Sequence, residues 1–230
     1  LNVDIIEVEG SGQLVNEGTL NANRIIMPTT GEVCNKAGGT MNVQLIEYQQ
    51  EFGKLTNSGD MHVKTLNAAY ILNGTMTNDG RIFIGGGFSR ANEVLGNGGI
   101  YYQLTLESCF VVEEGTDSDA LIPISVENGK YYAKWGSKIQ LKPDWNDNQF
   151  FKEWYAPNVF IDDESYDDED MTIQKTNIFT MPNWPATITA KYSTLSIADI
   201  TVEYGPYATN RYPLVVSGIY DGSGMGTVTY

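Results

Sequence analysis

Cysteine, histidine and positive charge are all scarce in this chain. Its 230 residues include 2 cysteines, 1 histidine and 14 lysines and arginines against 29 acidic residues, so the net charge is −15. Two cysteines do not make a disulfide framework; whether Cys34 and Cys109 pair stays open, although two buried free thiols are the more common arrangement. An acidic surface without a basic cluster repels nucleic acid and anionic lipid. We therefore expect no nucleic-acid partner.

Long hydrophobic runs are also missing. No stretch of about 18 apolar residues occurs, so we expect no membrane insertion within this chain. Residues 1–4 do not resemble a signal peptide; either such a signal was removed or it lies outside these residues. The acidic composition suits a protein that stays soluble outside the cell, and we expect an extracellular or cell-surface location.

The residues and motifs that carry catalysis are sparse. No nucleophile elbow, Walker loop or dinucleotide fingerprint is present, and His62 has no second histidine with which to share a metal ion. Its place between Met61 and Val63 predicts a solvent-facing strand residue. We predict a protein that is not an enzyme and has no cofactor. A glycosidase or polysaccharide lyase on a β-helix is the less favoured alternative, because few Asp or Arg residues share a repeat position.

Glycine and aromatic residues are plentiful, and asparagine recurs regularly in the first hundred residues. The 24 glycines and 11% aromatic residues are typical of a folded, turn-rich protein. The recurring pattern is apolar-x-Asn-x-Gly-x-apolar, with two extra residues in the second copy and one fewer before the apolar position in the last. Successive copies lie 19 to 22 residues apart, and their asparagines are Asn16, Asn35, Asn57, Asn78 and Asn97.

Each repeat also contains a second apolar stretch, such as 25–27, 43–46 or 70–72. Two short strands and two turns per period predict one coil of a β-solenoid, whose apolar face is buried when coils stack about 4.8 Å apart. Asparagine tolerates a corner's left-handed backbone and can bond to the asparagine of the next coil, while glycine permits the tight bend. The spacing resembles the repeats of filamentous haemagglutinin-type parallel β-helices of bacterial adhesins. Residues 1–100 are therefore expected to form a short right-handed parallel β-helix with an asparagine ladder.

The pattern changes after the last repeat. Strand-like segments over 101–193 lead to Phe-x-x-Trp at 151–154, Thr-Met-Pro at 180–182 and Thr-x-Thr-Ala at 187–190. These motifs resemble the Listeria–Bacteroides repeat, also called the divergent internalin B-repeat. The resemblance implies a small β-grasp-like spacer of surface proteins that is not associated with catalysis. Residues 194–230 hold three further strand candidates and are expected to be an appended β-unit or the start of a third module.

Two groups of side chains are candidates for binding. Trp145 and Trp184 lie in turns rich in Pro and Asn, where an exposed ring can stack on a ligand. An acidic insert at 162–170 departs from the family pattern. No spacing in it enforces a coordination geometry, so a solvated loop without a metal site is the simpler interpretation. The calcium candidates within it are Asp167, Asp168 and Asp170.

The sequence as a whole predicts an all-β protein of two modules with a short C-terminal β-unit. A solenoid comes first, and a small β-grasp-like module follows it. The predicted function is non-catalytic: surface presentation, adhesion or spacing as a stalk in a bacterial cell-surface protein, with a host or matrix protein or a glycan as partner. A carbohydrate-binding module is the alternative.

Overall fold

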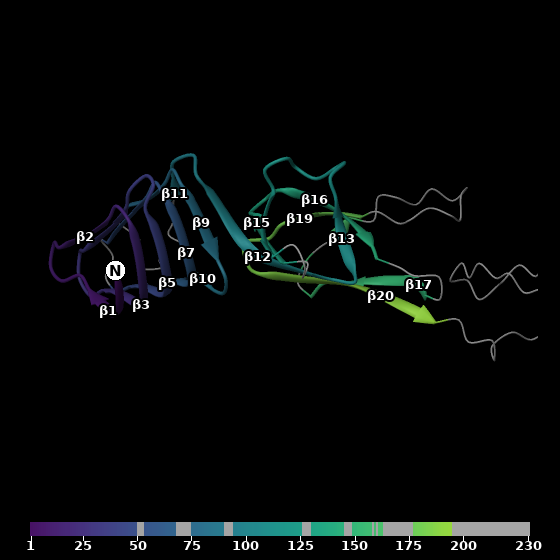
Figure 1. Cartoon of the computed structure of the whole chain (residues 1–230), viewed down its shortest axis with the longest axis horizontal. Helices are drawn as coiled ribbons and strands as arrows, with labels where there is room; N and C mark the ends of the chain where they lie inside the picture. Colours follow the sequence, from purple (N-terminus) through teal and green to yellow (C-terminus); the bar gives the residue numbers. More distant parts are fainter. Residues whose placement is uncertain are drawn as a thin grey trace, which may run out of the picture.

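The computed structural model of the chain consists of β-strands joined by turns. It describes residues 1–49, 53–67, 75–89, 94–125, 130–144, 149–157, 159, 161–162 and 177–194. Figure 1 shows a stack of coils at the N-terminal end and a second group of strands beyond it along the longest axis. No helix occurs among these residues, and the stacked strands are parallel, so the predicted all-β class and short parallel β-helix are confirmed.

Two parallel sheets build the coils, and each coil gives one strand to each sheet. The shorter strands lie in the order β11 (Val94–Leu95), β8 (Thr75–Asn78), β6 (Lys54–Asn57), β4 (Glu32–Asn35) and β2 (Gln13–Asn16). The longer strands lie in the order β1 (Asn2–Glu7), β3 (Thr19–Met27), β5 (Thr40–Tyr48), β7 (Asp60–Asn67) and β9 (Arg81–Ile84), and β10 (Phe88–Ser89) also pairs with β7. Within the described part of the chain, four coils are complete, from β2 with β3 to β8 with β9.

In-register pairing stacks equivalent residues of successive coils on one another. Leu20 pairs with Met41, Met41 with Met61 and Met61 with Ile82, and each of these side chains is at most 2% exposed. Burying an aliphatic side chain of this size contributes about 1.5–3 kcal/mol, so the columns hold the coils together. The corresponding buried column in the other sheet is Val33, Leu55 and Met76.

A ladder of buried asparagines runs along one corner of the coils. The Nδ2 of Asn16 donates to Oδ1 of Asn35 at 2.8 Å, Asn35 donates to Asn57 at 2.9 Å, and Asn57 donates to Asn78 at 2.8 Å. Each amide also donates to a backbone carbonyl of its corner, as Asn57 does to Gly59 at 3.1 Å. The ladder thereby satisfies polar groups that the tight corner would otherwise bury without partners.

Asn97 does not belong to this ladder, and the prediction that it extends the row is wrong. Pairing of β11 with β8 places Gly96, not Asn97, opposite Asn78. Gly96 has a φ of 94°, a backbone conformation that favours glycine. Asn97 is exposed, and its backbone N–H donates to the carboxylate of Asp79 at 3.2 Å. Because the last copy is one residue shorter before its apolar position, aligning that apolar residue moves the asparagine out of the row.

The remaining strands form two sheets around a hydrophobic core. One group extends the sheet of the longer strands and consists of β14 (Leu121–Ser125), β15 (Lys130–Lys134), β17 (Gln149–Tyr155) and β20 (Ala186–Thr194). The other sheet has the order β13 (Cys109–Val112), β16 (Lys138–Pro143), β19 (Asn177–Thr180) and β18 (Ile161–Asp162). Of the unit expected over 194–230, residues 195–230 lie outside the described part.

One strand, β12 (Gly99–Glu107), belongs to both parts of the molecule. Its residues 99–102 pair in parallel with β9 of the coils, and residues 104–107 pair in parallel with β20. Its other edge pairs antiparallel with β15. The module boundary expected after Ile100 therefore falls inside a strand, and the buried side chains on both sides of it form a single cluster.

Both cysteines are buried free thiols. Cys34 lies in β4 and Cys109 begins β13. Burial raises the pKa of the Cys109 thiol to about 12, and its Sγ lies 3.6 Å from the carbonyl oxygen of Ile188. A thiol held in this state is a packing residue rather than a nucleophile.

Candidate functional site

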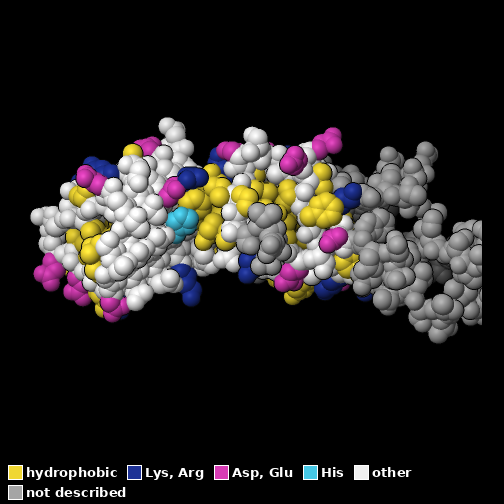
Figure 2. Space-filling model, in the orientation of Figure 1, with side chains coloured by type: hydrophobic (Ala, Val, Ile, Leu, Met, Phe, Trp, Pro, Cys, Tyr) yellow, Lys and Arg dark blue, Asp and Glu magenta, His cyan; other side chains and the backbone are white. Residues whose placement is uncertain are grey.

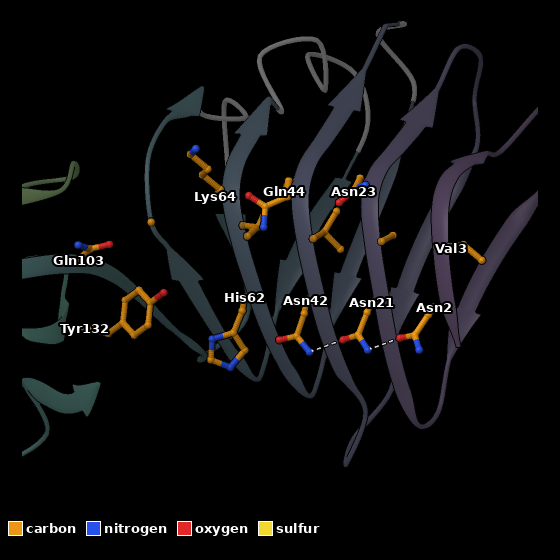
Figure 3. Close-up of a pocket in the computed structure, with 14 residues that line it drawn as sticks. Asn2, Val3, Asn21, Asn23, Asn42, Gln44, His62, Lys64, Gln103 and Tyr132 are labelled. Carbon is orange, nitrogen blue, oxygen red and sulfur yellow. Dashed lines mark hydrogen bonds between the residues drawn. The ribbon is translucent and has the colours of Figure 1, made fainter. Parts of the chain in front are cut away.

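An open groove of about 600 Å³ lies on the outward face of the sheet of longer strands. Figure 3 shows its side chains in two rows that run across the strands, with residues of the second module at one end. The first row begins with Asn2, Asn21 and Asn42, from β1, β3 and β5. The second row contains Asn23 and Gln44. Each lies two residues after a first-row asparagine of the same strand, with one buried residue in between.

Hydrogen bonds connect the amides of the first row. The Nδ2 of Asn21 donates to Oδ1 of Asn2 at 2.6 Å, and the Nδ2 of Asn42 donates to Oδ1 of Asn21 at 2.8 Å. The pairing register brings these amides together. Side chains of a strand point alternately to the two faces of the sheet, and these three residues pair with one another across β1, β3 and β5. This exposed amide row is separate from the buried corner ladder and lies on a surface that a ligand can reach.

The second row is polar and contains a gap. Asn23 donates through Nδ2 to the carboxylate of Asp4 at 2.6 Å. Farther along, Lys64 of β7 and Gln103 of β12 stand on either side of Gly85. Because glycine has no side chain, the groove stays open at that point.

At the end of the first row, aromatic rings occupy the positions that amides occupy in β1, β3 and β5. His62 follows Asn42 in the register, and its ring stacks on that of Phe83 with centroids 4.3 Å apart. Phe83 in turn contacts Tyr101 at 5.4 Å and Tyr132 at 5.1 Å. Phe83 points outward from its strand but is only 2% exposed, because these rings cover it. Tyr132 comes from β15, so the second module closes this end of the groove.

His62 faces outward, as the sequence predicts, but the neighbouring rings leave it half-buried. Burial lowers the pKa of its imidazole below the ordinary value; the carboxylate of Asp60 opposes this shift, and the guanidinium of Arg81 adds to it. Arg81 and Asp60 form an ion pair at 2.6 Å beside the ring. Burial therefore favours the neutral imidazole of His62, and Lys64 is the one Lys, Arg, Asp or Glu among the residues that line the groove.

The surface around the groove has little charge on the face shown in Figure 2. The histidine lies where polar, uncharged surface over the coils meets hydrophobic surface farther along the molecule. Among the described residues, no three His, Cys, Asp or Glu side chains gather closely enough to hold a metal ion. The groove offers hydrogen bonding and apolar contact, without a paired base and nucleophile.

The binding candidates from the sequence lie elsewhere. Trp184 is 44% exposed in the connection between β19 and β20, and it does not line the groove. Trp145 and the calcium candidates Asp167, Asp168 and Asp170 lie outside the described residues.

A signal for the exposed amide row was present in the sequence. Asn2 and Asn21 are 19 residues apart, and Asn21 and Asn42 are 21 apart, which is the period of the corner asparagines.

Comparison with protein families, curated proteins and solved structures finds no match to this chain. Within the described ranges, no helix is long and apolar enough to cross a membrane.

Proposed function

We propose that this chain is a non-catalytic module of a bacterial cell-surface protein, acting as a stiff spacer that presents an adhesive face. The observation that carries the proposal is the sharing of β12 between the coils and the second module. A spacer must hold its ends at a fixed separation, and a joint of this kind resists bending.

The physical reason lies in how the two parts are joined. Domains usually meet at linkers that few contacts cross, and relative motion is then the default. Here the pairing of β12 passes from β9 to β20 with one residue, Gln103, between the two partners. Side chains such as Tyr102 and Leu104, both 0% exposed, belong to a core that continues through the joint. Bending there would break sheet hydrogen bonds and expose apolar surface.

The chemistry of the groove supports the non-catalytic part of the proposal. General acid–base catalysis needs a group whose proton affinity suits the transfer and which reaches the reacting atom. His62 is engaged in a ring stack and has a lowered pKa. The nearby carboxylate of Asp60 is paired with Arg81. These groups support the packing of the face rather than bond cleavage.

Distance measurements between spin labels test the spacer role. One variant carries Lys36→Cys and Lys152→Cys, which places labels on exposed residues of the two parts. The matched control carries Glu9→Cys and Thr75→Cys, both exposed and both within the coils. We expect the distance distribution across the joint to be as narrow as that within the coils. A broad or two-peaked distribution across the joint alone would overturn the proposal.

The non-catalytic part is tested by incubating the protein with a panel of polysaccharides and measuring reducing ends and unsaturated products. We expect neither to rise above the level of the heat-denatured protein. Sustained release of either product from any substrate would show catalysis and contradict this part of the proposal.

A further inference from the structure

We propose that the groove binds a neutral, extended oligosaccharide through the side-chain amides of Asn21, Asn42 and Gln44, with Tyr132 and Gln103 closing one end. This goes beyond the spacer role, because it gives the outward face of the coils a ligand of defined chemistry. It also differs from the tryptophan sites that the sequence suggests.

The amides retain hydrogen-bonding capacity that the exposed row does not use. A side-chain amide has two N–H donors and an oxygen with two lone pairs. In the row, Asn21 uses one N–H toward Asn2 and one lone pair for Asn42. Asn21 therefore keeps one N–H and one lone pair unused, and Asn42, which uses one N–H toward Asn21, keeps at least as many. Sugar hydroxyl groups both donate and accept, so a row of such amides is complementary to them.

Charge selects a neutral ligand over an ionic one. The chain as a whole carries a net charge of −15, which repels anionic polymers, and Lys64 is the one charged residue among those lining the groove. A polyanion such as a uronate chain would meet a single cation, and the two carboxylates beside the groove, Asp4 and Asp60, are already bonded to Asn23 and Arg81. A neutral polyhydroxyl chain loses nothing from this distribution.

The position of the groove on a sheet face argues against an extended peptide. Peptides that add to sheets bind at an edge, where unpaired backbone groups supply the hydrogen bonds. Of the strands under the groove, β3, β5, β7 and β9 have partners on both sides, and β1 at one end is the edge strand, so most backbone groups beneath the groove are already used in the sheet. Only side chains face the ligand here.

The regular repeat of the amides favours a polymer over a compact molecule. Neighbouring strands lie about 4.8 Å apart, so side chains in one row recur at that interval. From β1 to β12 the sheet contains six strands in sequence, which corresponds to roughly 24 Å of surface. A linear chain of sugar rings can place one ring over each strand or two, and an open groove allows such a chain to pass through.

Isothermal titration calorimetry at pH 7.5 tests this proposal with three neutral hexasaccharides: cellohexaose, hexa-N-acetylchitohexaose and mannohexaose. We expect at least one to bind. The variants Asn42→Ala and Gln44→Ala should each weaken that binding by about three- to tenfold, the usual loss for one or two uncharged hydrogen bonds. Both residues are exposed, so the variants should remain folded, which thermal melting checks.

Asn97→Ala is the matched control, because it removes an exposed asparagine of the coils that lies away from the groove. Its affinity should equal that of the unaltered protein. The absence of binding to all three sugars would overturn the proposal, as would binding that both groove variants leave unchanged. Tighter binding of hexagalacturonate or of an unstructured polar peptide would also overturn it. None of these outcomes affects the spin-label distances, so failure of the sugar site and failure of the spacer role are distinguishable.

Discussion

Asn57 lies in the middle of the buried ladder and uses both the N–H and the oxygen of its side-chain amide. It is 0% exposed, accepts from Asn35, and donates to Asn78 and to the carbonyl of Gly59. Replacing it with alanine leaves these partners without a hydrogen bond in a buried corner, where an unsatisfied polar group costs about 1–3 kcal/mol. We expect Asn57→Ala to lower the free energy of unfolding by about 2–4 kcal/mol in urea titrations.

The control for this loss is Asn97→Ala. It removes the same side chain from an exposed position outside the ladder, and a surface change of this kind usually stays within about 0.5 kcal/mol. If the two variants lost similar stability, the ladder would have no special energetic role.

His62 gives the stability of the protein a pH dependence with a defined sign. Burial lowers the pKa of the folded imidazole, whereas the unfolded chain keeps the ordinary value of about 6.5. Below that pH the unfolded state binds the proton more readily, so the free energy of unfolding should decrease as the pH falls from about 7 to 5.5. Urea titrations at several pH values in this window measure the decrease.

His62→Phe removes the titrating group and keeps an aromatic ring beside Phe83. The decrease in stability between pH 7 and 5.5 should become smaller in this variant than in the unaltered protein. An identical pH profile in both proteins would show that other groups cause the dependence and that the imidazole is not held in its neutral form.

At the scale of the coil, a column of corner glycines sets how closely the coils approach. A β-carbon on Gly80 would overlap the backbone carbonyl of Gly59, the equivalent glycine of the preceding coil. Neither chain segment can move without breaking sheet bonds on both sides. We expect Gly80→Ala to destabilise the protein by about 3 kcal/mol, as overpacking of a rigid site does, when unfolding is followed by circular dichroism.

Gly18 is the matched control for this column. It occupies the same repeat position in the first coil, where a β-carbon would meet no atom within 4 Å. Gly18→Ala should leave stability unchanged or raise it by up to about 1 kcal/mol, because alanine restricts the unfolded chain. Equal destabilisation by the two substitutions would mean that backbone conformation, rather than close packing, requires glycine here.

The corner was predictable from the sequence because the same residue types recur there. The buried amide ladder requires asparagine, and the close approach of neighbouring coils requires glycine. The same residue types therefore recur at the corner from Asn16 to Asn78. The exposed row was harder to recognise, because its members change from Asn42 to His62 to Phe83 while keeping one register. Packing on an open face accepts several residue types, so the period is visible only once the strands are paired.

The joint between the two parts could not be predicted for a related reason. β12 reads as one alternating strand, and nothing in its residues shows that its partner changes from β9 to β20 after Tyr102. Partners of a strand are set by segments far away in the chain, here more than eighty residues later for β20. The local pattern therefore placed a boundary where the fold continues.

For the whole molecule, the shared strand makes the groove depend on both parts. Asn42 and Gln44 come from the coils, whereas Tyr132 comes from β15, which is held in place by its pairing with β12. The rings that cover Phe83 likewise come from both sides of the joint, as Tyr101 and Tyr132 do. Separating the parts would open one end of the groove and expose this cluster to water.

The same continuity predicts that the described part of the molecule unfolds as one unit. Leu104 is 0% exposed in the half of β12 that enters the second module, and truncating such a residue costs about 2–5 kcal/mol. If the core is cooperative across the joint, Leu104→Ala should keep a single urea transition and should lower hydrogen-exchange protection in β5 as much as in β16. Ile124→Ala, a truncation at a position that is 45% exposed in β14, should change either quantity little. Two separate transitions, with protection in β5 unchanged by Leu104→Ala, would show two independent domains and remove the mechanical basis of the proposed spacer role.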